Sequence, residues 1–118
     1  MSVDSLIKHL DSHREVSDFY ILVREVNLYL DIGHSYFSPR VGIKVWKSNV
    51  LSDEFHFTVS HNVHTPSQAA PYYPSRTSAS TEIAAINSAI DSITSFLKNA
   101  ISSGHEPEYE WMIPNEDY

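Results

Sequence analysis

The sequence predicts an α+β domain with the element order α-β-β-β-α. An antiparallel three-stranded meander sheet carries a long C-terminal helix on one face, and an acidic aromatic tail follows that helix. Apolar residues recur every three or four positions over 83–101, as in a helix packed along one side. Three earlier segments alternate apolar with polar residues, as half-buried strands do. Their connections are shorter than the crossover of roughly a dozen residues that parallel strands need, so we expect antiparallel pairing.

The N-terminal half holds the first helix and the strands. An amphipathic helix is expected over 3–16, and a long strand over 18–31. The even positions of that strand form an apolar face that only Arg24 interrupts. Shorter strands are expected over 41–46 and 55–64. The predicted helix stripe is Val3, Leu6, Ile7 and Leu10, and the predicted strand face is Tyr20, Leu22, Arg24, Val26, Leu28 and Leu30.

The C-terminal half begins with an irregular, proline-containing segment over 65–79, and the last helix follows it. Ser80 is expected to cap the start of this helix, and Gly104 suits the position after its end. Its expected apolar stripe is Ile83, Ile86, Ile90, Ile93, Leu97 and Ala100.

This order of elements resembles that of the double-stranded-RNA-binding domain family. That family places a lysine cluster at the start of its last helix. Here the corresponding stretch is Ser80-Thr81-Glu82-Ile83-Ala84-Ala85, which contains no base. The resemblance therefore covers the order of elements and does not imply RNA binding.

A single domain over 1–118 fits the length, and 42% hydrophobic residues suffice for a core. We divide it into a core, 1–104, and a tail, 105–118. The tail is expected to dock on the core or on a partner subunit, because it has more apolar area than disordered acidic tails carry. The alternative is a solvated acidic tail that keeps the protein soluble. Its apolar and aromatic residues are Tyr109, Trp111, Met112, Ile113 and Tyr118.

Several classes of protein are disfavoured by composition. Without cysteine there is no disulfide and no thiolate metal site, and no apolar run approaches the ~20 residues of a membrane span. The first residues lack the basic flank and apolar stretch of a signal peptide, and the three glycines form no phosphate-binding fingerprint. We therefore expect a cytoplasmic protein with no membrane partner and no cofactor.

The net charge of −7 is concentrated near the C-terminus. Residues 1–76 contain seven Lys or Arg and eight Asp or Glu, whereas residues 77–118 contain one and seven. A protein with this balance is not expected to bind long nucleic acids, which require a basic footprint. The nearly neutral first part carries all four arginines, so a site for one small anion is compatible with the overall charge.

The best candidate site is the segment Pro71–Thr77. Tyr72 and Tyr73 offer rings on which a base can stack, Arg76 offers a fork for phosphate or carboxylate, and Thr77 adds a hydroxyl. The competing interpretation is that the tyrosines cover the sheet and that Arg76 pairs with the acidic tail.

Two further arginines are candidates for supplying charge to this site. Arg24 must find a carboxylate, solvent or an anionic ligand, because an unpaired buried charge is costly. Arg40, next to Pro39, is a second candidate for contacting an anion.

Histidines provide a different candidate chemistry. The spacing of His61 and His64 is found in zinc sites, although residues three apart on a strand point to opposite faces. No GxSxG nucleophile motif accompanies them.

Three functional hypotheses follow. The leading one is a non-catalytic binding protein, a homo-oligomer, that captures or sequesters a small anionic or aromatic ligand such as a nucleotide. The first alternative is a protein–protein adaptor that uses the exposed sheet face and the acidic tail. The second alternative is a small hydrolase or metal enzyme built on His61 and His64.

Overall fold

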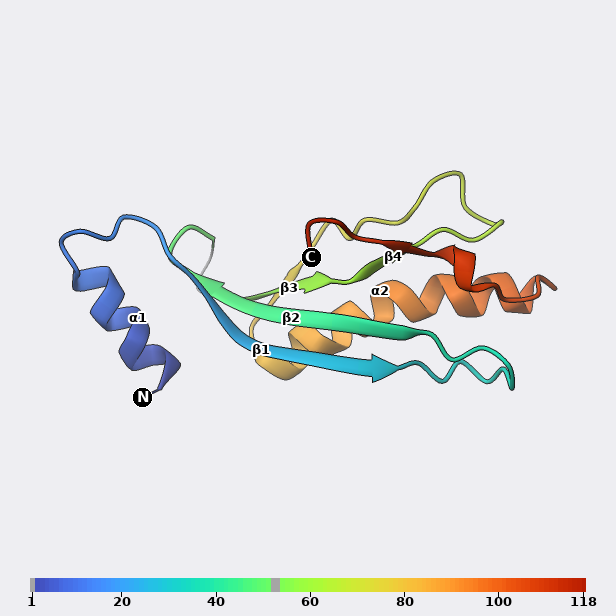
Figure 1. The fold of residues 1–118 in the computed structure, drawn as a ribbon, viewed down its shortest axis with the longest axis horizontal. Coiled ribbons are helices and arrows are strands. Elements are labelled where there is room, and N and C mark those ends of the chain that lie inside the picture. The colour runs from blue at the N-terminus through green and yellow to red at the C-terminus, as the bar shows by residue number, and fades with distance from the viewer. Residues whose placement is uncertain (1, 52–53) are drawn as a thin grey trace.

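The computed structural model describes residues 2–51 and 54–118 (Figure 1). The described part of the chain contains two α-helices and six strands. The helices are α1 (Val3–Ser12) and α2 (Glu82–Ser102), with a 3-10 turn η1 (Tyr109–Trp111). The strands are β1 (Tyr20–Tyr29), β2 (Arg40–Ser48), β3 (Phe55–Val59), β4 (His61–Val63), β5 (Ser78–Ala79) and β6 (Met112–Pro114).

The main sheet has the order β1-β2-β3-β5, and every neighbouring pair is antiparallel. Helix α2 runs along one face of this sheet (Figure 1). Val41, Ile43 and Val45 of β2 are fully buried and form the centre of the core with the inner side of α2. The predicted α+β class, the meander β1-β2-β3 and the helix on one face are thus confirmed.

The strand predicted over 55–64 is divided at Ser60 into β3 and β4. The expectation of one continuous strand is therefore wrong. The backbone N–H of Ser60 still donates to Gly42 O of β2 at 2.9 Å, but its carbonyl accepts from Asn115 N of the tail at 2.8 Å. Residues after Ser60 therefore pair with β6 in a second, two-stranded sheet. The tail supplies β6, and its Trp111 and Met112 are buried in the core.

Strand β1 contains a bulge that changes which residues share a face. Leu22 is opposite Trp46, whereas Arg24 is opposite Val45, so the register shifts between Leu22 and Arg24. Neighbours on β2 point to opposite faces, so Leu22 lies on the face opposite α2, and Arg24 lies on the α2 face. The expectation that all even-numbered residues of this strand share one face is therefore wrong.

Helix α2 is the longest element and starts one residue later than its predicted cap suggested. Thr81, rather than Ser80, is the N-cap, and its Oγ1 accepts from Ala84 N at 3.1 Å. Ile83 is exposed, contrary to expectation. The buried residues are Ala85, Ala89, Ile93, Leu97 and Ala100.

Helix α1 lies at one end of the elongated molecule, which measures 57 × 26 × 22 Å (Figure 1). It ends at Ser12, short of the predicted Val16, and contains no buried residue. Its apolar stripe is therefore only partly covered. Within the described residues, neither helix has the length and apolar character needed to cross a membrane.

Candidate functional site

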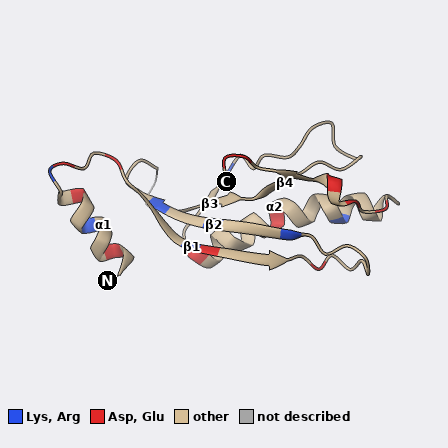
Figure 2. Cartoon of the chain, viewed as in Figure 1, with Lys and Arg blue, Asp and Glu red and all other residues tan. Residues whose placement is uncertain are grey.

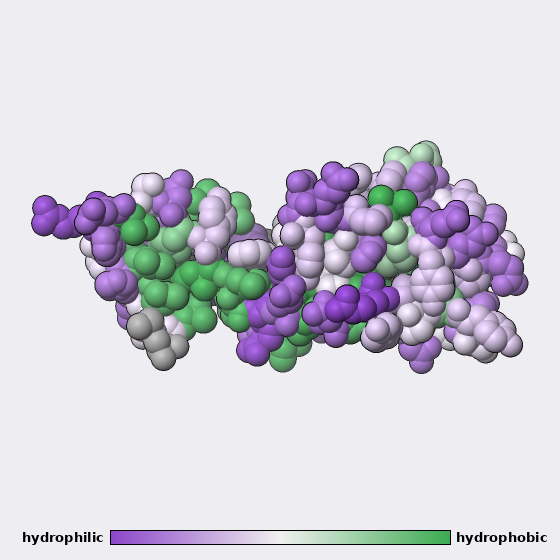
Figure 3. All heavy atoms as spheres, viewed as in Figure 1, coloured by the Kyte–Doolittle hydropathy of each residue, from purple (hydrophilic) through white to green (hydrophobic). Residues whose placement is uncertain are grey.

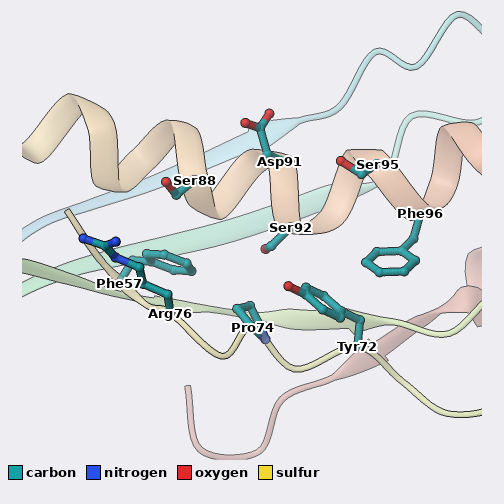
Figure 4. A pocket seen from close by; sticks show the side chains of 9 residues that line it. All are labelled: Phe57, Tyr72, Pro74, Arg76, Ser88, Asp91, Ser92, Ser95 and Phe96. Atoms are coloured by element: carbon teal, nitrogen blue, oxygen red, sulfur yellow. The ribbon is translucent and has the colours of Figure 1, made fainter.

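A groove of about 360 Å³ lies between the segment after β4 and helix α2 (Figure 4). This volume is at the lower end of the range typical of small-molecule sites, roughly 300–1,000 Å³. Figure 4 shows Arg76 at one end and Tyr72 with Phe96 at the other. The lining residues are Phe57, Tyr72, Pro74, Arg76, Ser88, Asp91, Ser92, Ser95 and Phe96.

The aromatic end of the groove is held in place by backbone hydrogen bonds. Tyr72 N donates to Val63 O at 3.0 Å, and the Asn62 amide donates to Tyr72 O at 3.2 Å. The ring of Tyr72 packs on Phe96 of α2 with centroids 4.5 Å apart. Because the backbone and the ring of Tyr72 both have fixed partners, a ligand would not need to order this residue on binding.

Helix α2 contributes a row of hydroxyls. Ser88, Ser92 and Ser95 are spaced four and three residues apart, which places them on one side of a helix. Ser92 points toward the loop and Asp91 points away from it, so the carboxylate lies at the rim (Figure 4). Ser92 donates to Ala89 O at 2.7 Å, which leaves its oxygen free to accept.

Arg76 is the only Lys or Arg among the described residues that line the groove, and its side chain is 79% exposed. Its Nη2 lies 4.0 Å from Glu54 Oε1. An exposed pair at this distance contributes at most about 1 kcal/mol, so the guanidinium is available to an incoming anion. The alternative that Arg76 pairs with the acidic tail does not match the structure, because its carboxylate partner is Glu54.

The neighbours of these residues point elsewhere. Tyr73 is exposed and faces a different hollow, which Asn115 and Asp117 of the tail also line. Thr77 lines that hollow too, and its carbonyl accepts from Phe57 N at 2.8 Å. Consecutive residues of an extended segment point to opposite sides, so Tyr72 and Tyr73 cannot both face α2.

The two further arginines do not line the groove. Arg24 is at the sheet edge, and its Nε donates to Glu82 Oε1 at the start of α2. This hydrogen bond, and then the charge of Glu82, raise the pKa of Arg24. Arg40 is exposed at the start of β2, opposite Tyr29 of β1. The structure thus brings together Tyr72 and Arg76, and leaves Tyr73, Thr77, Arg24 and Arg40 outside this groove.

The histidines of the metal hypothesis each have a partner nearby. His61 Nδ1 lies 2.7 Å from Ser60 Oγ, and burial lowers the pKa of His61. His64 Nε2 lies 3.2 Å from Gln68 O. Over residues 2–51 and 54–118 there is no cluster of three or more His, Asp or Glu side chains able to hold a metal ion. An enzyme built on His61 and His64 stays a prediction, as does the adaptor hypothesis.

The α2 side of the groove was not predicted from the sequence. The spacing of Ser88, Ser92 and Ser95 could have indicated it, because it places hydroxyls next to the apolar stripe. This spacing does not show which segment forms the other side of the groove, because Tyr72 is 24 positions away in the chain from Phe96, on which its ring packs.

Comparison with known proteins gives no relative for this chain: no family model matches it, and neither does any curated protein or solved structure. The resemblance to the double-stranded-RNA-binding domain therefore rests on the order of elements alone.

Proposed function

We propose that this chain is a non-catalytic binding protein that captures a small ligand bearing both a planar ring and an anionic group, such as a nucleotide. The observation that carries the proposal is the pairing of Tyr72 and Arg76 along one groove. A ring and a cation at opposite ends of a hollow of this size match the two ends of a nucleoside monophosphate.

Each part of such a ligand has a complementary group. Arg76 presents several N–H donors in a planar fork, which suits a phosphate or carboxylate. Tyr72 and Phe96 provide aromatic surface for a base. Between them, the hydroxyls of Ser88, Ser92 and Ser95 can hydrogen-bond to a sugar.

The test compares three probes by calorimetry and thermal shift: adenosine, inorganic phosphate and adenosine monophosphate. We expect adenosine monophosphate to bind more tightly than either fragment, because it alone reaches both ends of the groove. Binding to the folded state raises the melting temperature according to RT ln(1 + [L]/Kd). Binding by none of the three probes would contradict the proposal.

Two arginine variants locate the site. Arg76→Ala should weaken binding of adenosine monophosphate about tenfold, the loss of roughly 1.4 kcal/mol from a charge-assisted contact. Its melting temperature without ligand should not change, because the side chain is mostly exposed. Arg40→Ala is the matched control, since it removes the same charge outside the groove and should leave binding unchanged. Equal losses in both variants would indicate general charge attraction and no defined site.

A further inference from the structure

One end of the molecule carries a broad apolar surface. Figure 3 shows it as a green region where α1 meets the start of the sheet. Apolar side chains there are unusually exposed: Tyr20 is 58%, Leu22 43% and Leu51 49% accessible. We define the N-terminal surface as α1, β1 and the turn 49–51.

Helix α1 lacks the cover that a helix of its length needs. Isolated helices shorter than about 12–15 residues are marginal in water, and α1 has ten. Its stability must come from packing of its apolar stripe, yet none of its residues is buried. The stripe residues, all only half-buried, are Val3, Leu6, Ile7 and Leu10.

Strand β1 adds an open edge to this surface. Among the strands in the described part of the chain, β1 pairs with β2 alone. Its other edge therefore offers a row of backbone N–H and C=O groups over ten residues. An antiparallel strand from a second copy satisfies such a row by symmetry, because each donor then meets an acceptor.

The distribution of charge favours a second copy as the occupant. The N-terminal surface contains Lys8 and Arg24 against Asp4, Asp11 and Glu25, a net charge of −1. The rest of the chain contains six Lys or Arg and twelve Asp or Glu, and so holds −6 of the net charge of −7. Helix α1 carries both signs in Figure 2, whereas the charged residues of the tail are red. Two copies that meet through the N-terminal surface therefore repel each other less than they would through the more acidic remainder of the chain.

The size of the surface suits a stable dimer. Its elements contain 23 residues, and 21 remain when Val26 and Leu28, which pack against the core, are left out. Standard interfaces take roughly 20–30 residues from each partner. We propose that two copies of this chain associate through the N-terminal surface about a two-fold axis, covering the α1 stripe and the β1 edge.

Sedimentation velocity from low micromolar to several hundred micromolar protein tests this. The wild-type chain should approach twice its mass of 13.4 kDa. Leu22→Asp and Ile7→Asp should each raise the dimer dissociation constant at least tenfold, as burying an unpaired charge costs well over 1.4 kcal/mol. Tyr36→Asp, at a residue 88% exposed in the β1–β2 connection, should leave the dimer intact.

A cross-linking measurement keeps the test valid if an aspartate variant fails to fold. The chain has no cysteine, so Leu22→Cys introduces a single thiol. A bis-maleimide reagent should join two copies of this variant and should not join copies of Tyr36→Cys. A wild-type chain that stays monomeric throughout, or a dimer that only Tyr36→Cys can cross-link, would overturn the proposal. Neither result affects the ligand-binding proposal, which is tested on a different face.

Discussion

At the scale of single residues, Gly42 allows the end of the tail to lie on the sheet. A Cβ added at Gly42 would meet Tyr118 Oη at 2.5 Å and Asn27 Oδ1 at 3.0 Å. Tyr118 Oη donates to Glu25 Oε2 at 3.0 Å, and Lys44 Nζ lies 4.1 Å from the centre of its ring. Burial, and then this hydrogen bond to Glu25, raise the pKa of Tyr118 to about 12.

Gly42→Ala should therefore displace the Tyr118 ring while preserving the fold, because the nearest atom belongs to the far end of a side chain. The pKa of Tyr118 should fall from about 12 toward its usual value of 10.0. Ultraviolet absorbance of tyrosinate between pH 9 and 13 measures this. If Tyr118 titrated in Gly42→Ala as it does in the wild type, the position of its ring would not depend on the absence of a side chain at residue 42.

The same raised pKa predicts a dependence of stability on alkaline pH. Folding favours the neutral phenol of Tyr118, so its contribution to the free energy of unfolding is full below pH 10 and declines as pH rises through about 12. Denaturant unfolding of the wild type and of Tyr118→Phe measures it. The stability difference between the two should shrink over this window. A constant difference would contradict the assignment of the shift to Tyr118.

At the scale of elements, α2 owes its position to its start and to its small buried residues. The side-chain oxygen of Thr81 accepts a hydrogen bond from Ala84 N at the N-terminus of the helix. Ala85 and Ala89 are fully buried against the sheet, so the first half of the helix approaches it closely. Its larger buried residues, Ile93 and Leu97, lie in the second half.

Thr81→Ala should lower the free energy of unfolding by about 1 kcal/mol, the usual contribution of an N-cap side chain. Ser80→Ala is the matched control, since Ser80 is exposed and does not cap the helix. It should stay within about 0.5 kcal/mol of wild type. Urea unfolding followed by circular dichroism distinguishes the two. A larger loss in Ser80→Ala would mean that the helix starts one residue earlier in solution.

At the scale of the whole molecule, the tail is part of the core. Trp111 contacts the ring of Phe37 and is 5% exposed, and Trp111 O accepts from His64 N at 2.9 Å. The β4–β6 sheet and this ring thus close the end of the core opposite α1 (Figure 1).

Trp111→Ala should consequently cost about 3–5 kcal/mol, the range for deleting a large buried aromatic side chain. Tyr109→Ala serves as its control: Tyr109 also packs on Phe37 but is exposed, so its loss should be much smaller. Thermal denaturation of both variants provides the comparison. Similar melting temperatures for Trp111→Ala and wild type would show that the tail is dispensable for stability.

The site was only partly predictable. Tyr72 and Arg76 were expected together because ring and cation lie four residues apart in one loop. Tyr73 and Thr77 face another hollow because the backbone of this segment is extended. Arg24 forms its hydrogen bond with Glu82, a residue 58 positions away in the chain. Local sequence does not contain such distant contacts.

The sequence by itself determined the α+β class, the antiparallel meander and the long C-terminal helix, because the apolar period of each segment reflects which side it buries. Tertiary structure alone decided three features: the bulge in β1, the division of the third strand at Ser60 and the pairing of the tail as β6. These depend on hydrogen bonds between residues far apart in the chain, such as Asn115 N to Ser60 O. The groove belongs to the same category, since neither α2 nor the loop forms it without the other.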